Sequence, residues 1–336
     1  MVSYIIPVYN AEKTIERCLL SVIKQTFQDI EILVVNDGST DNTLDIVSDI
    51  ALSDKRIRII TIENRGVSGA RNTGLMYTKG EYVQFLDGDD YVHANLTQYL
   101  YESIVEGGCD LAGCGYYGVE KGKIVYKSGL NRVYNSRNEW KKEMPVLYEC
   151  GFLNTVWNKL YKRELIKENF SEKYSFGEDM LFNLLYISKI DKIVISDEAL
   201  HFYSVPDNRV HLSNRYNKSH LEAVFTNYME IKNIIDDDCT YIQEFAWHYR
   251  REIFRLLIKS VICNTKKQEF EKCIEAINTQ TKKLFEEKIN SNKLHIDICW
   301  ELLEKNQVGC LRVYLTLCII PRRMYMFVKR IFKIWG

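Results

Sequence analysis

Three aspartates lie within four residues of one another, directly after an apolar run. In FLDGDD, Asp87, Asp89 and Asp90 follow the strand-like sequence EYVQFL. Carboxylates this close repel one another, and Asp-Gly by itself is typical of a solvated turn. Hard oxygen ligands bind Mg²⁺ or Mn²⁺, and a bound divalent cation removes the repulsion between them. The cluster is therefore a candidate cation site, with a solvated turn as the alternative.

Two further carboxylates open a predicted helix. In SFGEDMLFNLL, Glu178 and Asp179 precede an apolar-periodic run whose expected buried side carries Leu181, Leu184 and Leu185. Acidic residues in the first turn interact favourably with the helix dipole, which is one sufficient explanation for the pair. The same position is expected to lower the pKa of Asp179 and so to weaken it as a proton acceptor.

Another acidic position follows a second strand-like run. Asp37 comes directly after IEILVVN and is followed by Gly38, which lets a ligand approach the backbone while the carboxylate accepts hydrogen bonds. Ser39, Thr40 or Asp41 is expected to cap the next helix, and this capping is the alternative explanation for the polar run. We interpret Asp37 itself as a candidate ligand contact.

The segment ENRGVSGARN adds a cation. Arg71 and the glycines Gly66 and Gly69 lie near a predicted helix start, which suits approach by a phosphate or ribose oxygen. The two glycines also suit an ordinary loop. The segment does not match the dinucleotide pattern G-x-G-x-x-G, which disfavours a nicotinamide or flavin enzyme.

Alternating strands and helices must position these residues. Strands are predicted at residues 3–7, 30–35, 57–60 and 81–86. The first helix is expected to be capped by Asn10 and to bury the apolar stripe formed by Ile15, Cys18, Leu19 and Val22. This alternation predicts an α/β fold with a mainly parallel sheet flanked by helices. Because the polar clusters follow four successive strands, and ligands of such sheets bind outside the carboxyl ends of the strands, we expect a nucleotide-type site there.

The rest of the chain changes character twice. Residues 111–214 mix short strands with polar loops, and the pattern then becomes mainly helical. We predict one catalytic domain over residues 1–214, with a nucleotide-binding half (1–110) and an acceptor-binding half (111–214). A helical C-terminal region is predicted over residues 215–336.

The basic tail, residues 310–336, carries arginines and lysines without any acidic residue and is divided by Pro321. After the proline, apolar residues recur at helical spacing while the basic residues fall largely elsewhere around the axis. This pattern is typical of a helix that lies on an anionic membrane surface. A helix packed on the protein's own core is the alternative.

The composition argues against several classes of protein. The chain has 336 residues, 46% of them hydrophobic, and a formal net charge of zero, so it has no basic excess typical of nucleic-acid binding. Its ten cysteines form no Cys-x-x-Cys pair, which disfavours a zinc module or a disulfide framework and favours reduced thiols in the cytosol. MVSYIIPVYN does not resemble a secretion signal, and no apolar run reaches the roughly 18 residues that a membrane-spanning helix needs.

Four motifs in order carry a family resemblance. IIPVYN, VVNDGSTDNT, ENRGVSGARNTGL and YVQFLDGDDYV, over about the first hundred residues, closely resemble family 2 glycosyltransferases. The resemblance implies the GT-A fold and an inverting transfer of a sugar from a nucleoside diphosphate, usually UDP, with Mn²⁺ or Mg²⁺. It also implies a nucleotide pocket, with Asp37 at the uracil, formed by Pro7, Tyr9, Asn10, Asp37 and Gly38.

By the same resemblance, Asp87, Gly88 and Asp89 form the Asp-x-Asp motif, with Asp89 as the direct metal ligand and Asp87 nearer the ribose and the metal. The cation bridges the two phosphates and balances the charge of the leaving nucleoside diphosphate. In the Glu-Asp motif of Glu178 and Asp179, Asp179 is the candidate base that takes the proton of the acceptor hydroxyl.

The acceptor-side residues match the family less closely. Trp157 is expected to stack on a sugar and Lys159 to reach a diphosphate, with a core tryptophan and a solvated lysine as the alternatives. In HFYSVPDNRVHLSN, Ser204 stands where relatives often carry an arginine. Arg209 is a candidate substitute for the missing charge, and His211 is a candidate metal ligand or a structural histidine.

The residues and the resemblance together predict a metal-dependent hexosyl- or N-acetylhexosaminyltransferase with a UDP-sugar donor and a lipid-linked glycan acceptor. The basic tail suggests a cytoplasmic protein attached peripherally to the inner face of the cell membrane, in bacterial cell-surface polysaccharide synthesis. A sugar nucleotidyltransferase is one alternative, although PVYNAEKT has no glycine for a phosphate loop. A noncatalytic nucleotide-sugar-binding module is the other, although the carboxylates are uninterrupted.

Overall fold

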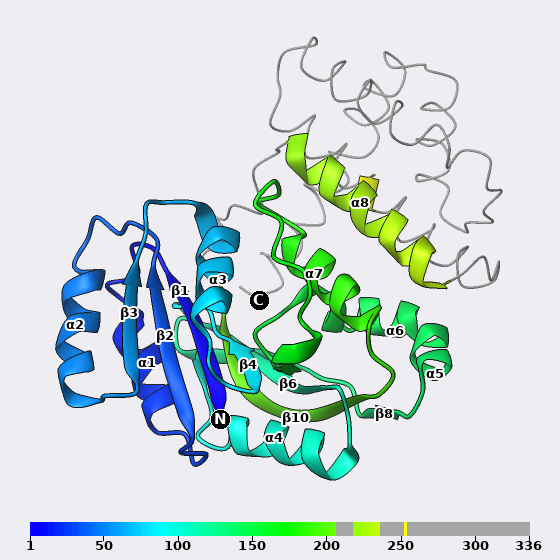
Figure 1. The fold of residues 1–336 in the computed structure, drawn as a ribbon, viewed down its shortest axis with the longest axis horizontal. Helices are drawn as coiled ribbons and strands as arrows, with labels where there is room; N and C mark the ends of the chain where they lie inside the picture. The colour runs from blue at the N-terminus through cyan, green and yellow to red at the C-terminus, as the bar shows by residue number, and fades with distance from the viewer. Residues whose placement is uncertain (206–217, 236–251, 254–336) are drawn as a thin grey trace, which may run out of the picture. The chain divides into compact units, whose positions relative to one another are not determined.

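The computed structural model describes residues 1–205, 218–235 and 252–253 (Figure 1). The chain divides into two units, Met1–Val210 and His211–Gly336. Arg209, His211 and the basic tail lie outside the described residues. The expected domain boundary between residues 214 and 215 stays a prediction.

The first unit is built on one mixed sheet. Its strands are β1 (Val2–Val8), β2 (Ile30–Asn36), β3 (Ile57–Thr61), β4 (Tyr82–Phe85), β5 (Tyr91–Val92), β6 (Leu111–Glu120), β7 (Lys123–Ser128), β8 (Arg132–Tyr134), β9 (Lys159–Lys162) and β10 (Ile193–Ser204). The order along the sheet is β3-β2-β1-β4-β9-β6-β10-β5, and β7 and β8 pair with β6 and β10. β3, β2, β1 and β4 are mutually parallel, β9 is antiparallel to both of its neighbours, and β6 is parallel to β10. The four predicted strands nearly coincide with β1 to β4, and the predicted α/β architecture is confirmed.

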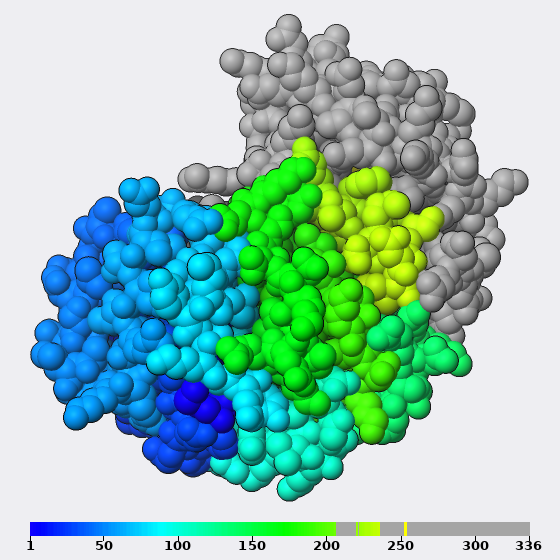
Figure 2. All heavy atoms as spheres, in the orientation of Figure 1, coloured from blue at the N-terminus to red at the C-terminus, as the bar shows by residue number. Residues whose placement is uncertain are grey.

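Helices cover both faces of this sheet (Figure 1). The helices of the described residues are α1 (Ile15–Ile23), α2 (Thr43–Ser53), α3 (Gly66–Tyr77), α4 (Leu96–Gly107), α5 (Arg137–Lys142), α6 (Met144–Glu149), α7 (Glu178–Ile187) and α8 (Lys218–Ile235), with 3₁₀ turns at Phe152–Asn154 and Arg163–Leu165. In the first unit, the blue, cyan and green residues form one continuous surface (Figure 2).

Alternate residues of β1 face opposite layers. Tyr4 and Ile6 belong to the core that α1, α2 and α4 complete, whereas Ile5 faces α3. A Cβ added to Gly74 of α3 would lie 2.4 Å from Ile5 Cγ2, so the glycine lets this helix lie directly on the strand. Burial on both faces explains why β1 is a continuous apolar run and does not alternate with polar residues.

Aromatic rings close the α3 side of the sheet. Phe85 of β4 lies 5.6 Å from Tyr161, 5.2 Å from Phe170 and 5.6 Å from Phe182, measured between ring centroids. Phe170 and Phe182 stack at 4.1 Å. Because Phe182 belongs to α7, these contacts hold α7 beside the strand that leads into the acidic residues.

The buried side of α7 differs from the expected one. Leu184 is buried, but Leu181 and Leu185 are only half-buried, and Phe182 and Asn183 take core positions. The predicted buried side of this helix follows the spacing of its leucines. The tertiary structure instead buries Phe182 in the aromatic cluster and Asn183, whose amide is hydrogen-bonded. Asn183 Oδ1 accepts the hydroxyl hydrogen of Tyr161 at 2.7 Å.

Two further observations concern membrane-spanning helices and cysteines. Within the described residues, no helix is both long enough and apolar enough to cross a membrane. The described cysteines, Cys18, Cys109, Cys114 and Cys150, are free thiols.

Candidate active site

The carboxyl ends of β1, β2 and β4 meet at one edge of the sheet, because these strands are parallel neighbours. The N–H of Asp37 donates to Val8 O at 2.9 Å, which joins the ends of β2 and β1. The acidic loop, residues 87–90, crosses the end of β1. A Cβ at Gly88 would lie 2.9 Å from Val8 Cγ1 and 3.2 Å from Pro7 O, so only glycine allows this approach.

The expected nucleotide pocket lies at the β1 and β2 side of this edge. Pro7 is buried within β1, and Tyr9 just beyond it is 52% exposed. Asp37 is 3% exposed, and its Oδ1 accepts the backbone N–H of Arg65 at 2.7 Å. This bond leaves Oδ2 of Asp37 for a ligand. Gly38 has a φ of 71°, a conformation that glycine adopts without strain.

Asn10 does not cap α1, so that prediction was wrong. Its N–H donates to Ser39 Oγ at 3.1 Å and its Oδ1 accepts the N–H of Thr40 at 2.8 Å, so it joins the segments after β1 and β2. Because Thr40 occupies the side-chain oxygen of Asn10, this oxygen does not accept an N–H of the first turn of α1. None of the residues expected to cap α2 takes its N-cap position, which belongs to Asn42 and has no side-chain cap hydrogen bond. Asp41, one residue earlier, accepts the N–H of Thr43 with its Oδ1 at 3.0 Å.

The last aspartate of the acidic loop is a buried structural group. Asp90 Oδ1 accepts the N–H of Ser204 at 2.7 Å, and its Oδ2 lies 2.8 Å from His201 Nε2. Burial raises the pKa of Asp90 and lowers the pKa of His201 to about 3, so His201 is neutral and shares one buried hydrogen bond with Asp90. Sequence reasoning missed this pair, because no local pattern connects residues so far apart in the chain.

Arg71 lies between two groups of carboxylates. Its Nη2 is 2.7 Å from Asp87 Oδ1, its Nη1 is 2.5 Å from Asp179 Oδ1, and Glu178 Oε1 lies 3.9 Å from Nη1. The side chain is 3% exposed. Burial opposes its charge, but Asp179, Asp87 and Glu178 outweigh that effect and raise the pKa of Arg71. Approach by a phosphate or ribose oxygen stays a prediction for Arg71, whose guanidinium is engaged by carboxylates here.

Asp179 has the environment of a general base. Burial raises its pKa to about 7, against the opposing effect of Arg71. The pKa of Asp179 is therefore raised and not lowered as expected, because desolvation of the carboxylate outweighs the positive charge of Arg71. Burial also raises the pKa of Glu178, whose Oε2 is buried without a hydrogen-bond partner. A carboxylate with a pKa near neutral pH suits proton transfer at that pH.

The two acceptor-side residues are buried, which corrects the direct contacts expected of them. Trp157 is 5% exposed, and its ring stacks on His201 at 4.1 Å between centroids. Lys159 is fully buried, and its Nζ donates to Thr155 O at 2.6 Å and to Asn158 Oδ1 at 2.8 Å. Burial lowers the pKa of Lys159 to about 7. Both side chains support the acidic loop and α7 from within the core.

An arginine that sequence reasoning missed reaches Ser204. Arg17 of α1 donates from Nη2 to Ser204 Oγ at 2.9 Å and to Asp89 O at 2.7 Å. Ser204 stands where relatives often carry an arginine, and Arg209 was the candidate to replace that charge. Arg17 supplies a positive charge from a different element.

The acidic loop fits a divalent cation that is bound together with phosphates. In the part of the chain that the structure describes, no three His, Cys, Asp or Glu side chains form a cluster that could hold a metal ion. Mg²⁺ commonly takes one or two carboxylates and completes its shell with water and substrate phosphates. Asp89 and Asp87 would supply the carboxylates of such a site. Desolvation and the neighbouring Asp90 and Asp87 raise the pKa of Asp89, because each disfavours a further negative charge at that position.

Comparison with known proteins agrees with this geometry. Glycosyl transferase family 2 matches residues 3–170, half of the chain. The chain is 39% identical over 209 residues to a protein named glycosyltransferase EpsJ of Bacillus subtilis. This alignment covers 60% of each chain. It is 34% identical over 215 residues to glycosyltransferase GlyA of Streptococcus pneumoniae, covering 61% of this chain and 30% of that one. The matched region thus spans 60% and 30% of the length of these relatives.

Solved structures share the fold. The crystal structure of residues 1–349 of S. aureus TarS aligns with a TM-score of 0.72 at 23% identity, covering 94% of this chain and 90% of that one. The same protein was crystallised with UDP and with UDP-GlcNAc. The mannosyltransferase PcManGT of Pyrobaculum calidifontis, in complex with GDP-Man and Mn²⁺, aligns with a TM-score of 0.52 at 16% identity. With its four motifs in order at the strand ends of a GT-A sheet, the chain belongs to glycosyl transferase family 2.

Proposed function

We propose that the chain is an inverting glycosyltransferase that moves a hexosyl or N-acetylhexosaminyl group from a UDP-sugar to a hydroxyl of a glycan acceptor. The observation that carries the proposal is the position of Arg71, which bonds both Asp87 and Asp179. One guanidinium joins the loop assigned to the donor's diphosphate to the candidate base. The sugar would therefore lie where both segments can reach it.

The donor site is assigned to the edge formed by β1, β2 and β4. Asp37 is buried and has one oxygen engaged by Arg65, so its other oxygen can accept a hydrogen bond from the nucleobase. The complexes of TarS with UDP and UDP-GlcNAc support a uridine nucleotide. Asp89 and Asp87 would hold Mn²⁺ or Mg²⁺, which supplies positive charge that balances the leaving diphosphate. The Mn²⁺ complex of PcManGT supports this assignment.

The transfer itself needs one proton acceptor. As the acceptor oxygen forms its bond to the anomeric carbon, the bond from that carbon to the phosphate oxygen breaks, and its electrons leave with UDP. Asp179 takes the proton of the attacking hydroxyl. Because Arg71 holds Oδ1 of Asp179, Oδ2 is the oxygen that can accept this proton. The raised pKa of Asp179 makes the carboxylate a stronger base than an exposed aspartate would be.

The biological setting is proposed from relatives and from the tail. The chain is 31% identical over 225 residues to the poly(ribitol-phosphate) beta-glucosyltransferase of Bacillus spizizenii, covering 64% of this chain and 34% of that one. This relative supports a role in bacterial cell-surface polysaccharide synthesis. The basic tail supports peripheral attachment to the inner face of the cell membrane. A variant that ends before Pro321 should lose sedimentation with phosphatidylglycerol vesicles, and full sedimentation of that variant would refute the membrane role.

Release of the nucleoside diphosphate tests the chemistry. The purified full chain is incubated with Mn²⁺ and a panel of nucleotide sugars, with and without lipid-linked acceptors. UDP release that requires one UDP-sugar and an acceptor is the expected result. Asp89→Asn and chelation should abolish it, whereas the exposed control Asp29→Asn should not. Release that persists in Asp89→Asn and after chelation would rule out the metal assignment, and nucleotide binding without any turnover would favour a noncatalytic module.

A further inference from the structure

Three consecutive carbonyl groups of the acidic loop accept hydrogen bonds from one face of the α1 segment. The donors are Thr14 Oγ1 to Gly88 O at 2.9 Å, Arg17 Nη2 to Asp89 O at 2.7 Å, and Cys18 Sγ to Asp87 O at 3.7 Å. Residues three and four positions apart lie on the same side of a helix, which is why one turn can serve three successive peptide groups. The backbone of the loop is therefore held by the α1 segment, while the carboxylate of Asp87 pairs with Arg71 in the site.

Arg17 differs from the other two donors because it also joins a third element. Its Nη2 donates to Ser204 Oγ of β10 at 2.9 Å, and Ser204 Oγ itself donates to Asp89 O at 2.5 Å. The carbonyl of Asp89 thus receives one donor from α1 and one from β10. The N–H of Ser204 donates to Asp90 Oδ1, so the same residue holds the next side chain of the loop.

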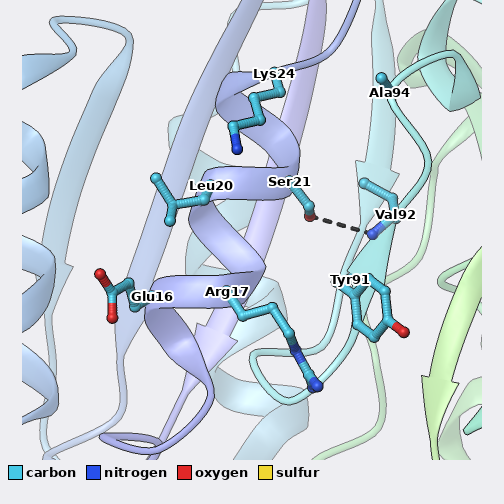
Figure 3. Close-up of a pocket in the computed structure, with 8 residues that line it drawn as sticks. All are labelled: Glu16, Arg17, Leu20, Ser21, Lys24, Tyr91, Val92 and Ala94. Atoms are coloured by element: carbon cyan, nitrogen blue, oxygen red, sulfur yellow. Dashed lines mark hydrogen bonds between the residues drawn. The ribbon is translucent and has the colours of Figure 1, made fainter. Parts of the chain in front are cut away.

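The guanidinium of Arg17 is itself held in place. Its Cζ lies 4.4 Å from the centroid of the Tyr91 ring, and Figure 3 shows the two side chains next to each other. The Tyr91 ring stacks on Phe202 at 4.6 Å with an interplanar angle of 2°. Arg17 and Tyr91 also line an open cavity of about 550 Å³ between α1 and β5, together with Glu16, Leu20, Ser21, Lys24, Val92 and Ala94 (Figure 3).

Exposure makes Arg17 separable from the core. The residue is exposed along the wall of this cavity, so its truncation opens no buried void. Its chemistry is also specific, because a planar guanidinium can stack on an aromatic ring and donate two hydrogen bonds at once, whereas a lysine ammonium is a compact point charge. Any effect of replacing Arg17 should therefore arise at the acidic loop and not from loss of packing.

We propose that Arg17 is a positioning residue for Asp89. With its guanidinium over the Tyr91 ring and its Nη2 bonded to both Asp89 O and Ser204 Oγ, it fixes the peptide that carries the Asp89 carboxylate, the proposed ligand of the divalent cation. Groups that orient a metal ligand without touching the metal commonly change metal affinity by about 10-fold to 100-fold when removed. The inference rests on the proposed function, because it assumes that Asp89 binds a cation together with UDP.

Calorimetric titration of Mn²⁺ into the full chain with saturating UDP tests the proposal. Arg17→Ala should weaken Mn²⁺ binding by about 10-fold or more, and Arg17→Lys should recover only part of the affinity, because the compact lysine ammonium cannot replace the planar guanidinium that lies over the Tyr91 ring. Lys24→Ala is the matched control, since Lys24 lines the same cavity from the same segment but is not among the donors to the loop. It should bind Mn²⁺ as the wild type does.

Two more measurements distinguish the possible outcomes. Amide hydrogen exchange of residues 86–90 in the metal-free protein should be faster in Arg17→Ala than in Lys24→Ala, with the two melting temperatures nearly equal. Unchanged Mn²⁺ affinity and unchanged exchange in Arg17→Ala would refute the role of Arg17 while leaving the donor site intact. Failure of the wild type to bind Mn²⁺ with UDP would instead overturn the proposed donor site, and this role with it.

Discussion

Arg71 Nη1 lies 2.5 Å from Asp179 Oδ1, so the candidate base is paired with a buried cation. The other end of the same guanidinium is 2.7 Å from Asp87 Oδ1. The pair places a carboxylate with a raised pKa next to a charge that opposes that rise. The position of Arg71 therefore sets both where Asp179 lies and at what pH it can accept a proton.

The pH dependence of kcat/KM should follow Asp179. Its pKa of about 7 means that the carboxylate is protonated at lower pH and cannot take the acceptor's proton, so we expect kcat/KM to fall as the pH drops below about 7. In Arg71→Gln the opposing charge is gone, so the pKa of Asp179 should rise and the acidic limb should move to higher pH. The profile is measured at saturating Mn²⁺, and circular dichroism checks that the variant is folded. A limb that stays in place in Arg71→Gln would contradict the assignment of the base.

Asp179→Asn should remove proton transfer and preserve the shape of the site. General-base groups commonly contribute about 10²-fold to 10⁴-fold, so we expect kcat to fall by that range while UDP affinity changes little. Asp191→Asn is the control, because Asp191 is 72% exposed and its ion pair is with Arg137, which is not a residue of the site. Single-turnover kinetics and UDP titration separate the two effects. Equal losses of kcat and UDP affinity would indicate that Asp179 binds the donor and does not act as the base.

Gly74→Ala should destabilise the packing of α3, the helix that carries Arg71, on the sheet. The added Cβ would lie 2.4 Å from Ile5 Cγ2, and forced overpacking of this kind commonly costs about 1–3 kcal/mol. Met76→Ala, on the same helix but 78% exposed, should change the free energy of unfolding by less than about 0.5 kcal/mol. Urea denaturation measures both. Equal stabilities would mean that α3 can shift away from β1 without cost.

His201→Leu and His201→Gln should differ in stability. Leucine leaves Asp90 Oδ2 without its donor in a buried position, which commonly costs about 1–3 kcal/mol, whereas the amide of glutamine can replace the donated hydrogen bond. Thermal melting of the two variants gives the comparison. If both variants lose the same stability, the contribution of His201 is its stacking on Trp157 and not its hydrogen bond.

Local patterns were enough for much of the architecture. Ile15, Cys18, Leu19 and Val22 are all buried on α1 as their spacing predicts, because a helix shows its apolar stripe within one or two turns of sequence. The strand ends were equally readable, since a parallel sheet brings its carboxyl ends to one edge whatever the details of packing. Boundaries of elements and the convergence of the polar motifs followed from these two regularities.

Contacts between distant elements were not readable in the same way. Asn10 was expected to cap a helix, Lys159 to reach a diphosphate or be solvated, and Asp179 to have a lowered pKa. In each case a tertiary partner or burial decides the outcome: Ser39 and Thr40 take Asn10, the core encloses Lys159, and desolvation raises the pKa of Asp179. A single sequence does not show which of these groups lie close together in space.

By itself, the sequence determined the alternation of strands and helices, the family motifs and the residue types available at the strand ends, because these depend on neighbours in the chain. Only the tertiary structure decided that Arg71 bridges Asp87 and Asp179, and that Arg17 reaches Asp89 and Ser204. Hydrogen bonds and desolvation act over a few ångströms of space. Which residues come within that range is set by how the helices pack on the sheet.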